Sequence, residues 1–313
     1  MSSAPVLPIS FVIVSDFEPG PKSWDDENDC LRRIMADPHG IPAQVVIAAS
    51  ASFRDTAVPD WSDIPVPVQL VFADSAFSGT IKNAATSHAT QDLVTVVEAD
   101  CLTTPGWLSG LYRKYLEDPD LDAVTGITMY DPTSAMRRVA GLYDRGYLEE
   151  RLASGDARHV SNNGALYRKS FLLQFPYEDD PSPFVSAHKR HNAMHAARKR
   201  VGLAPDAVQY HAYGGWPFIV DVRKNKGLQY QIMWQNTLSA PPTRWQKAWW
   251  SLRLLYSGMR VDFATLRRSF RTFCTPADLP LALVFPFLVR PLELWGAILA
   301  HKGHKAVPET AYR

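Results

Sequence analysis

The sequence predicts an α/β fold, in which a mostly parallel sheet is flanked by helices, followed by a helical C-terminal region. Short β-branched apolar runs alternate with helical patterns over the first half of the chain, which is typical of parallel sheets. From about Pro241 the composition changes to basic and aromatic residues at helical spacing. We therefore expect one large domain over residues 1–235 and a basic, aromatic, amphipathic helical region over residues 236–313.

Each expected element rests on a local pattern. Continuous apolar runs predict buried strands, and they cover residues 9–14, 44–49, 66–72, 93–97 and 123–129, with a shorter strand-like segment at 163–167. Helices are expected at residues 25–36, 80–89, 104–117 and 186–201. The third of these helices has Thr104 as its N-cap residue and Pro105 at its first helical position.

Composition excludes several classes of protein. With 313 residues, 46% of them hydrophobic and 21% charged, the chain can bury its own core without disulfides. A net charge of +1 gives no overall attraction to nucleic acid, which is not expected as a partner. The cysteines Cys30, Cys101 and Cys274 form no CxxC pair and fit a reducing compartment. The N-terminal segment lacks signal-peptide features, and no run reaches about 18 apolar residues, so we expect a cytoplasmic location.

An acidic segment follows the strand at residues 93–97. In parallel α/β sheets ligands bind at the carboxyl ends of strands, and Glu98-Ala99-Asp100 lies at such an end, just before a helix. Two carboxylates at this spacing can reach one Mg²⁺ or Mn²⁺ ion, which takes further ligands from phosphate. The alternative is an acidic turn that caps the helix after Thr104, since short motifs often occur by chance.

Several segments, in a fixed order along the chain, together resemble family 2 glycosyltransferases with the GT-A fold. That family has a glycine and then a basic residue with Asn at the start of a helix, a strand ending in a DxD-type motif, and a "pGWl" segment. Two later segments are similar to the family's "gN.alrr" and "G.ri.y.P.a.v.H" patterns. The corresponding residues here are 77–85, 94–100, 104–108, 162–168 and 202–211, and the resemblance covers roughly residues 8–235.

The resemblance implies a GT-A fold, which is Rossmann-like, and a nucleoside-diphosphate sugar as donor. It implies that Asp100 and Glu98 hold Mn²⁺ or Mg²⁺ on the donor diphosphate, that His211 lies near that metal or the diphosphate, and that Lys82 faces phosphate. The residues implied for binding the nucleotide are Ser15, Phe17, Glu18, Lys82, Asn83, Glu98 and Asn163. The metal and Lys82 would stabilise the leaving diphosphate.

The general base that deprotonates the acceptor hydroxyl is expected in the acidic turn or shortly after it. The candidates are Glu178, Asp179 and Asp180, or else His188, and the alternative is a solvated acidic turn before Pro181. Two departures from the family pattern leave an alternative open. No acid follows the strand at 44–49 until Asp55, and the position of the family's base falls near residues 186–188, where no carboxylate stands.

His188, His191 and His195 could share one helix face, because they are spaced three and four residues apart. A metal cluster is disfavoured, because five Lys or Arg residues between positions 189 and 200 would repel a divalent cation. We expect this basic helix to be solvated or to face an anion such as phosphate.

The C-terminal region leaves three alternatives open, namely core packing, a partner helix or a peripheral membrane patch. Tryptophans at 245, 249 and 250 are interleaved with arginines, a pattern that suits the surface of an anionic bilayer. The apolar stretch from Leu279 to Ala300 is interrupted by prolines and carries Arg290 and Glu293. We expect it to lie at the inner face of the cell membrane if it contacts lipid, and not to cross it.

The sequence thus favours a metal-dependent inverting glycosyltransferase that extends a glycan or a lipid-linked saccharide. The alternative is a non-catalytic, degenerate member of the family that acts as a partner subunit and binds sugar nucleotide or membrane. A nucleotidyltransferase is disfavoured because no glycine-rich loop with Lys or Arg follows the first strand, and a dehydrogenase because no GxGxxG follows any strand.

Overall fold

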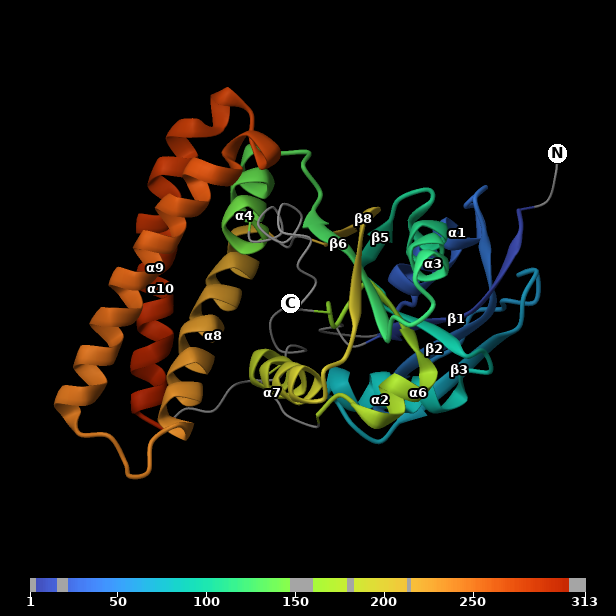
Figure 1. The fold of residues 1–313 in the computed structure, drawn as a ribbon, viewed down its shortest axis with the longest axis horizontal. Helices are drawn as coiled ribbons and strands as arrows, with labels where there is room; N and C mark the ends of the chain where they lie inside the picture. Colours follow the sequence, from blue (N-terminus) through green and yellow to red (C-terminus); the bar gives the residue numbers. More distant parts are fainter. Residues whose placement is uncertain (1–3, 16–21, 147–159, 179–182, 213–214, 304–313) are drawn as a thin grey trace. The chain divides into compact units, whose positions relative to one another are not determined.

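The computed structural model describes residues 4–15, 22–146, 160–178, 183–212 and 215–303, with backbone alone for residues 183–186 and 188 (Figure 1). The chain divides into two compact units. Terminal residues aside, the first contains residues 1–129 and 151–212, and the second contains residues 130–150 and 213–308. The expected domain boundary between residues 235 and 236 stays a prediction.

The first unit is built on an eight-stranded sheet with the strand order β3-β2-β1-β4-β7-β6-β8-β5. Its strands are β1 (Val6–Ser15), β2 (Ile41–Ser50), β3 (Val68–Ala73), β4 (Leu93–Glu98), β5 (Cys101–Thr103), β6 (Ala123–Tyr130), β7 (Ala165–Arg168) and β8 (Val201–His211). Pairing is parallel from β3 through β2 and β1 to β4. The expected α/β class with a mostly parallel sheet is confirmed, and the carboxyl ends of these four strands share one edge.

The other half of the sheet is largely antiparallel, which the sequence did not predict. β7 pairs antiparallel with both β4 and β6, and β5 pairs antiparallel with β8. The pairing of β5 with β8 aligns Cys101 with His211, residues that lie far apart in the sequence. This register brings the end of β8 beside the segment that follows β4.

Helices cover both faces of the sheet, and the alternation along β1 shows why. Ile9, Phe11 and Ile13 join one buried cluster with residues of α1 (Asp25–Met35) and α3 (Trp107–Glu117). Val12 and Val14 join a second cluster with residues of α2 (Ser78–His88), α6 (Lys169–Gln174) and α7 (Pro183–Ala196). A strand buried on both faces must be apolar at nearly every position, as the continuous run in β1 is.

The helix expected from Thr104 begins instead at Trp107, so the predicted cap was wrong. Gly106 is the N-cap residue, with a left-handed φ of 82° that glycine adopts without steric cost. Its N–H is bound by Asp37 Oδ2 at 2.8 Å. Thr104 is committed elsewhere, because its hydroxyl donates to the Val208 carbonyl of β8 at 2.7 Å.

The second unit is helical and contains α4 (Ala135–Arg145), α8 (Gly215–Asn236), α9 (Arg244–Phe273) and α10 (Leu279–His301). The helical character expected for the C-terminal region is confirmed, but α10 is one continuous helix although Pro286 and Pro291 lie inside it. Its close packing against α8 accounts for this. A Cβ on Gly227 of α8 or on Gly296 of α10 would lie within 2 Å of a carbonyl oxygen of the facing helix.

A network of buried charges lies inside this helical unit. Arg223 is fully buried and forms ion pairs with Asp144 and with Glu293, the latter at 2.9 Å. Arg290 is paired with Asp262 and with the same Glu293. Nearby acids raise the pKa of Arg223 in spite of its burial, which alone would lower it. Each buried charge therefore has a partner, as burial in a helical core requires.

Removing one member of this network should destabilise the protein strongly. We expect Arg223→Met to lower the free energy of unfolding by about 3–5 kcal/mol, because Asp144 and Glu293 would lose their buried partner. Urea unfolding followed by circular dichroism measures the change. The matched variant Lys114→Met breaks an exposed pair with Glu117 and should stay within about 0.5 kcal/mol of wild type. Equal stability of the two variants would contradict a buried network that holds the unit together.

Candidate functional site

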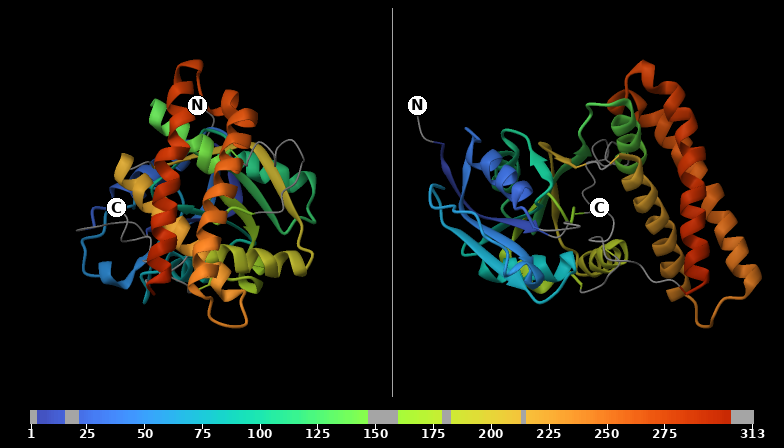
Figure 2. Two further views of the ribbon diagram at one scale, coloured as in Figure 1. Left: turned by 90° about the vertical axis from the view of Figure 1, so that its left-hand side faces the viewer. Right: turned by 180° about the vertical axis from the view of Figure 1, so that it is seen from behind.

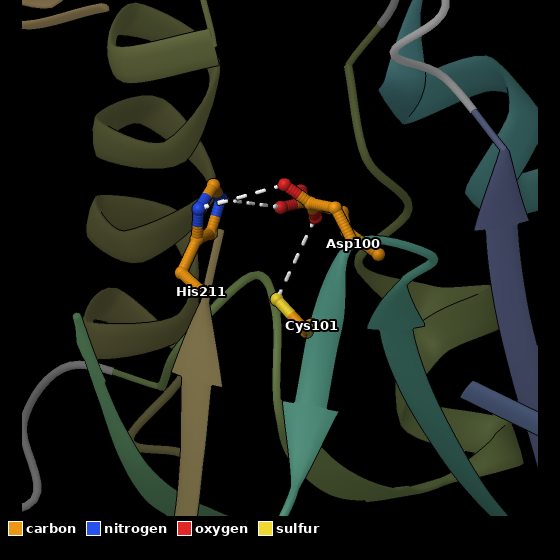
Figure 3. Close-up of side chains that lie close together, drawn as sticks. Asp100, Cys101 and His211 are labelled. Carbon is orange, nitrogen blue, oxygen red and sulfur yellow. Dashed lines mark hydrogen bonds and ion pairs between the residues drawn. The ribbon is translucent and has the colours of Figure 1, made fainter. Parts of the chain in front are cut away.

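Four side chains meet where β4 ends. Glu98 is the last residue of β4, and Asp100 follows it at the turn into β5. The antiparallel register of β5 and β8 places Cys101 opposite His211, and the Ala212 N–H donates to the Asp100 carbonyl at 3.2 Å. Figure 3 shows the side chains of Asp100, Cys101 and His211 pointing toward one another from these elements.

We call Glu98, Asp100, Cys101 and His211 the metal-ligand cluster. One ligand atom from each residue lies within 4.8 Å of the others, and three of the four residues are buried. Carboxylate oxygens and an imidazole nitrogen suit Mn²⁺, and a thiolate is a ligand that softer ions favour. The pair Glu98 and Asp100 expected as metal ligands is thus brought together with His211.

The contacts of the two ring nitrogens of His211 bear on whether these four residues fit a cation. Its Nδ1 lies 2.8 Å from the Ala212 carbonyl oxygen, which only accepts, so Nδ1 carries the hydrogen. In the neutral ring this leaves a lone pair on Nε2, which lies 3.4 Å from Glu98 Oε2. Two acceptors at this distance are stabilised by a cation between them or by a second proton on the ring. The donor set therefore fits a divalent metal ion.

The carboxylate of Glu98 is fixed by two further residues. Lys82 Nζ on α2 donates to Oε1 at 2.8 Å, and Asn163 Nδ2 donates to Oε2 at 2.7 Å. Asn163 also accepts from the Glu98 N–H at 3.0 Å, and it is held in turn by Gln209 of β8. Lys82, which was expected to face phosphate, contacts Glu98 directly, so its positive charge lies next to the metal-ligand cluster.

Opposing effects act on the pKa of Glu98. Burial alone would raise the pKa, but the charge of Lys82 and the hydrogen bond and charge of His211 lower it well below the ordinary value of 4.5. Glu98 is therefore ionised at neutral pH, as a metal ligand must be.

Other expected nucleotide-binding residues occupy different surroundings. Ser15 ends β1 at the same sheet edge as Glu98 and is buried. Asn83 donates to the Tyr177 carbonyl at 2.7 Å and accepts from the Tyr177 N–H at 2.9 Å. Both ends of its amide thus hold the segment that leads to residue 178. Phe17 and Glu18 lie outside the described residues.

The expected general bases stay predictions. Asp179 and Asp180 lie outside the described residues, as does the side chain of His188. Glu178, the acid before them, binds Lys189 Nζ at 3.0 Å. In the sequence, Asp179 and Asp180 lie between Tyr177, which Asn83 holds, and α7, which contains His188.

Two residues at this site were not expected from the sequence. Cys101 directly follows the acidic motif, and that position was the signal for it. Arg190, counted among the basic residues of an expected solvated helix, is buried and stacks on the Tyr177 ring at 4.1 Å. Its guanidinium donates to the Phe175 carbonyl and to Asn162.

Among the side chains described, neither His191 nor His195 belongs to a group that could hold a metal.

Comparison with known families points to the same part of the chain. Residues 78–174 match the family described as glycosyl transferase family 2. This stretch contains Lys82, three members of the metal-ligand cluster and Asn163. No curated protein matches the chain in sequence.

Solved structures show the fold. A mannosyltransferase from Pyrobaculum calidifontis, in complex with GDP-Man and Mn²⁺, is 15% identical; the match covers 95% of this chain and 88% of that one, with a TM-score of 0.57. A glucosyl-3-phosphoglycerate synthase from Mycobacterium tuberculosis, in complex with Mn²⁺, UDP and phosphoglyceric acid, is 12% identical; the match covers 75% and 80% of the two chains, with a TM-score of 0.47. At such identities a likeness shows fold alone, and the first structure confirms the expected GT-A-like fold.

Metal binding should depend on the acids of the cluster. We expect Asp100→Asn to weaken Mn²⁺ binding roughly 100-fold or more, because changes even outside the ligand shell cost about 10–100-fold. Isothermal titration with Mn²⁺ alone measures the affinity. Asp120→Asn, an exposed acid elsewhere on the first unit, is the matched control and should bind as wild type does. Retention of wild-type affinity by Asp100→Asn would exclude the cluster as the binding site.

The pKa of Glu98 predicts a pH dependence of stability in the metal-free protein. A pKa lowered by folding contributes stability above the unfolded value of about 4.5, and the contribution is lost as pH falls toward the folded pKa. Glu98→Gln lacks this contribution, so its deficit in unfolding free energy should be full at pH 7 and shrink below pH 4.5. Urea unfolding in EDTA measures it. A deficit that stays constant down to pH 3 would show that Glu98 is not the ionised partner of Lys82.

Proposed function

We propose that this chain is a family 2 glycosyltransferase and that it transfers a sugar from a nucleoside-diphosphate sugar with inversion; the match over residues 78–174 and the fold support this. The acceptor is a hydroxyl of a glycan or of a lipid-linked saccharide, and the reaction depends on Mn²⁺ or a similar divalent ion. The observation that carries this proposal is the metal-ligand cluster at the carboxyl end of β4. In an α/β sheet that is the edge where ligands bind.

Glu98, Asp100 and His211 would hold the ion, with Cys101 beside them. A bound divalent cation neutralises negative charge that develops on the leaving diphosphate. The residues around it prepare the site for this, because Lys82 and Asn163 fix the Glu98 carboxylate in one orientation. A ligand that is already oriented needs no reorganisation when the donor binds.

Local charge supports an anionic substrate. Glu98 and Asp100 contribute two carboxylates to the cluster, and Lys82 contributes one positive charge beside them. A divalent ion would add two positive charges to this group, which attracts a diphosphate. The related mannosyltransferase structure holds GDP-Man and Mn²⁺, which supports a sugar nucleotide as the donor for this chain also.

Inversion requires that the acceptor hydroxyl attack the sugar from the side opposite the diphosphate in a single displacement. A base must take the hydroxyl proton during that step. We place this role on Asp179 or Asp180, with His188 as the remaining candidate. All three lie between Tyr177 and the middle of α7. The backbone of Tyr177 is held by two hydrogen bonds to Asn83 of α2.

A non-catalytic partner subunit is the second candidate function. It is favoured by one observation, the lack of an acid directly after β2. There the Ser50 hydroxyl caps a short helical turn by accepting from the Ser52 N–H. The donor base would have to be recognised elsewhere. The carboxylate and imidazole groups that meet at the cluster favour the catalytic proposal.

Product analysis with a panel of nucleoside-diphosphate sugars tests the proposal. We expect transfer or slow donor hydrolysis with one donor in the presence of Mn²⁺, and its loss in EDTA. Asp100→Ala should reduce turnover by roughly 100-fold or more, since metal stabilisation of charge supplies several kcal/mol. NMR of the anomeric proton distinguishes inversion from retention.

The control for this experiment is Asp120→Ala, which should turn over at the wild-type rate. Wild-type turnover by Asp100→Ala would refute the metal-dependent mechanism. Thermal stabilisation by a nucleotide without any transfer or hydrolysis would favour the partner subunit instead, because binding to the native state raises the melting temperature whether or not chemistry follows.

A further inference from the structure

α10 has the reverse polarity of a surface helix in a water-soluble protein, because its charged residues are buried and its exposed residues are apolar. Arg290 and Glu293, its charged residues between Leu279 and Ala300, point into the unit and are buried in the ionic network. Its outward positions are apolar throughout. The exposed residues are Leu279, Pro280, Leu283, Val284, Phe287, Leu288, Pro291, Trp295 and Ile298.

α9 runs antiparallel beside α10 (Figure 2). Its own exposed apolar residues extend this surface. Ser251 contacts His301 at one end of the pair, and Asp262 binds Arg290 near the middle. Phe263 of α9 and Phe287 of α10 are both exposed and touch edge to face, with ring centroids 6.2 Å apart. The exposed faces of the two helices therefore lie on the same side.

The large exposed apolar residues of α9, apart from Val261, form one narrow stripe. At 3.6 residues per turn they fall within an arc of about 60° centred near Phe263; they are Trp245, Trp249, Leu252, Tyr256 and Phe263, all exposed. Trp250, which the sequence grouped with Trp245 and Trp249, does not belong to the stripe. It stacks on Trp234 of α8 with ring centroids 5.0 Å apart.

A row of arginines borders the stripe. Arg253, Arg260, Arg267 and Arg271 are exposed and occupy the adjacent arc of about 40° on the same helix. The acid of α9, Asp262, is buried against Arg290 and cannot offset them at the surface. The surface of the pair is thus apolar and aromatic with one strongly basic border.

We propose that this α9–α10 surface docks on an anionic lipid bilayer and lies in the interface between headgroups and acyl chains. The inference stands apart from the catalytic proposal, since no residue of the metal-ligand cluster takes part in it. Arginines beside tryptophans match anionic headgroups above an apolar layer. A second copy of the chain is a poorer occupant, because two arginine rows of the same sign would repel each other.

The same contacts favour a helix that lies on the membrane over one that crosses it. The segment Pro276–His301 is long and apolar enough to span a bilayer by length and composition, but 44% of its most apolar window is buried within the protein. The buried face packs against α8 and carries the ionic pairs with Asp262 and Arg223. A helix that lies in the membrane interface needs one apolar face toward the lipid, while its opposite face contacts the rest of the protein.

Flotation of the full chain with vesicles of phosphatidylcholine alone or mixed with phosphatidylglycerol tests this proposal. We expect binding to the anionic vesicles, weakening in high salt. Trp249→Ser combined with Phe287→Ser should reduce the bound fraction, and Arg253→Glu combined with Arg260→Glu should reduce vesicle affinity by roughly tenfold or more. Circular dichroism of each variant checks that the fold is kept, as expected for exposed positions.

Matched controls separate this surface from general stickiness. Val261→Ser removes an exposed apolar residue on the opposite side of α9, and Arg33→Glu with Arg54→Glu reverses two exposed charges on the first unit. Both should bind vesicles as wild type does. Equal binding by wild type and the Trp249/Phe287 variant would overturn the proposal, as would resistance to both high salt and alkaline carbonate, which indicates a spanning helix. A lipid-free dimer abolished by the same variant would assign the surface to a second copy instead.

Discussion

The burial of one ionised carboxylate, that of Glu98, organises the first unit. A charge at the end of a buried strand is costly unless other groups compensate it. Lys82 from α2, Asn163 from the segment before β7 and His211 from β8 all converge on its two oxygens. Each partner comes from a different part of the chain, so the antiparallel half of the sheet must be in register before the charge is satisfied. The site and the topology therefore depend on the same contact.

The parallel half of this fold could be predicted from sequence because its information is local. Continuous apolar runs such as that of β1 indicate strands buried on both faces, and the acidic residues after β4 mark a strand end. The antiparallel half could not, because the register of Cys101 opposite His211 is a long-range pairing with no local signal. The cap of α3 was wrong for a similar reason: Thr104 fits a capping pattern locally but is used to join β5 to β8.

The contacts of individual side chains were harder to predict than their place in the fold. The structure brings Lys82 and Asp100 to the end of β4, but the sequence did not show that Lys82 would bind Glu98 itself. Arg190 looked like one more exposed charge in a basic helix, while the structure buries it between aromatic rings and carbonyl groups. In α10 the prolines suggested interruption, but Gly227 and Gly296 allow a helix contact so close that packing outweighs the missing hydrogen bonds.

The two units treat buried charge in opposite ways, and the difference bears on function. In the helical unit Asp144, Asp262 and Glu293 are matched by Arg223 and Arg290, with Lys226 close by, so the network is near neutrality without any ligand. In the metal-ligand cluster two carboxylates face one lysine, and the excess negative charge lies where ligand atoms converge. A neutral network stabilises packing without a bound ion. The unbalanced network, which Asn163 and Lys82 hold in place, would gain stability from a bound cation, and for that reason we propose the reaction at the end of β4.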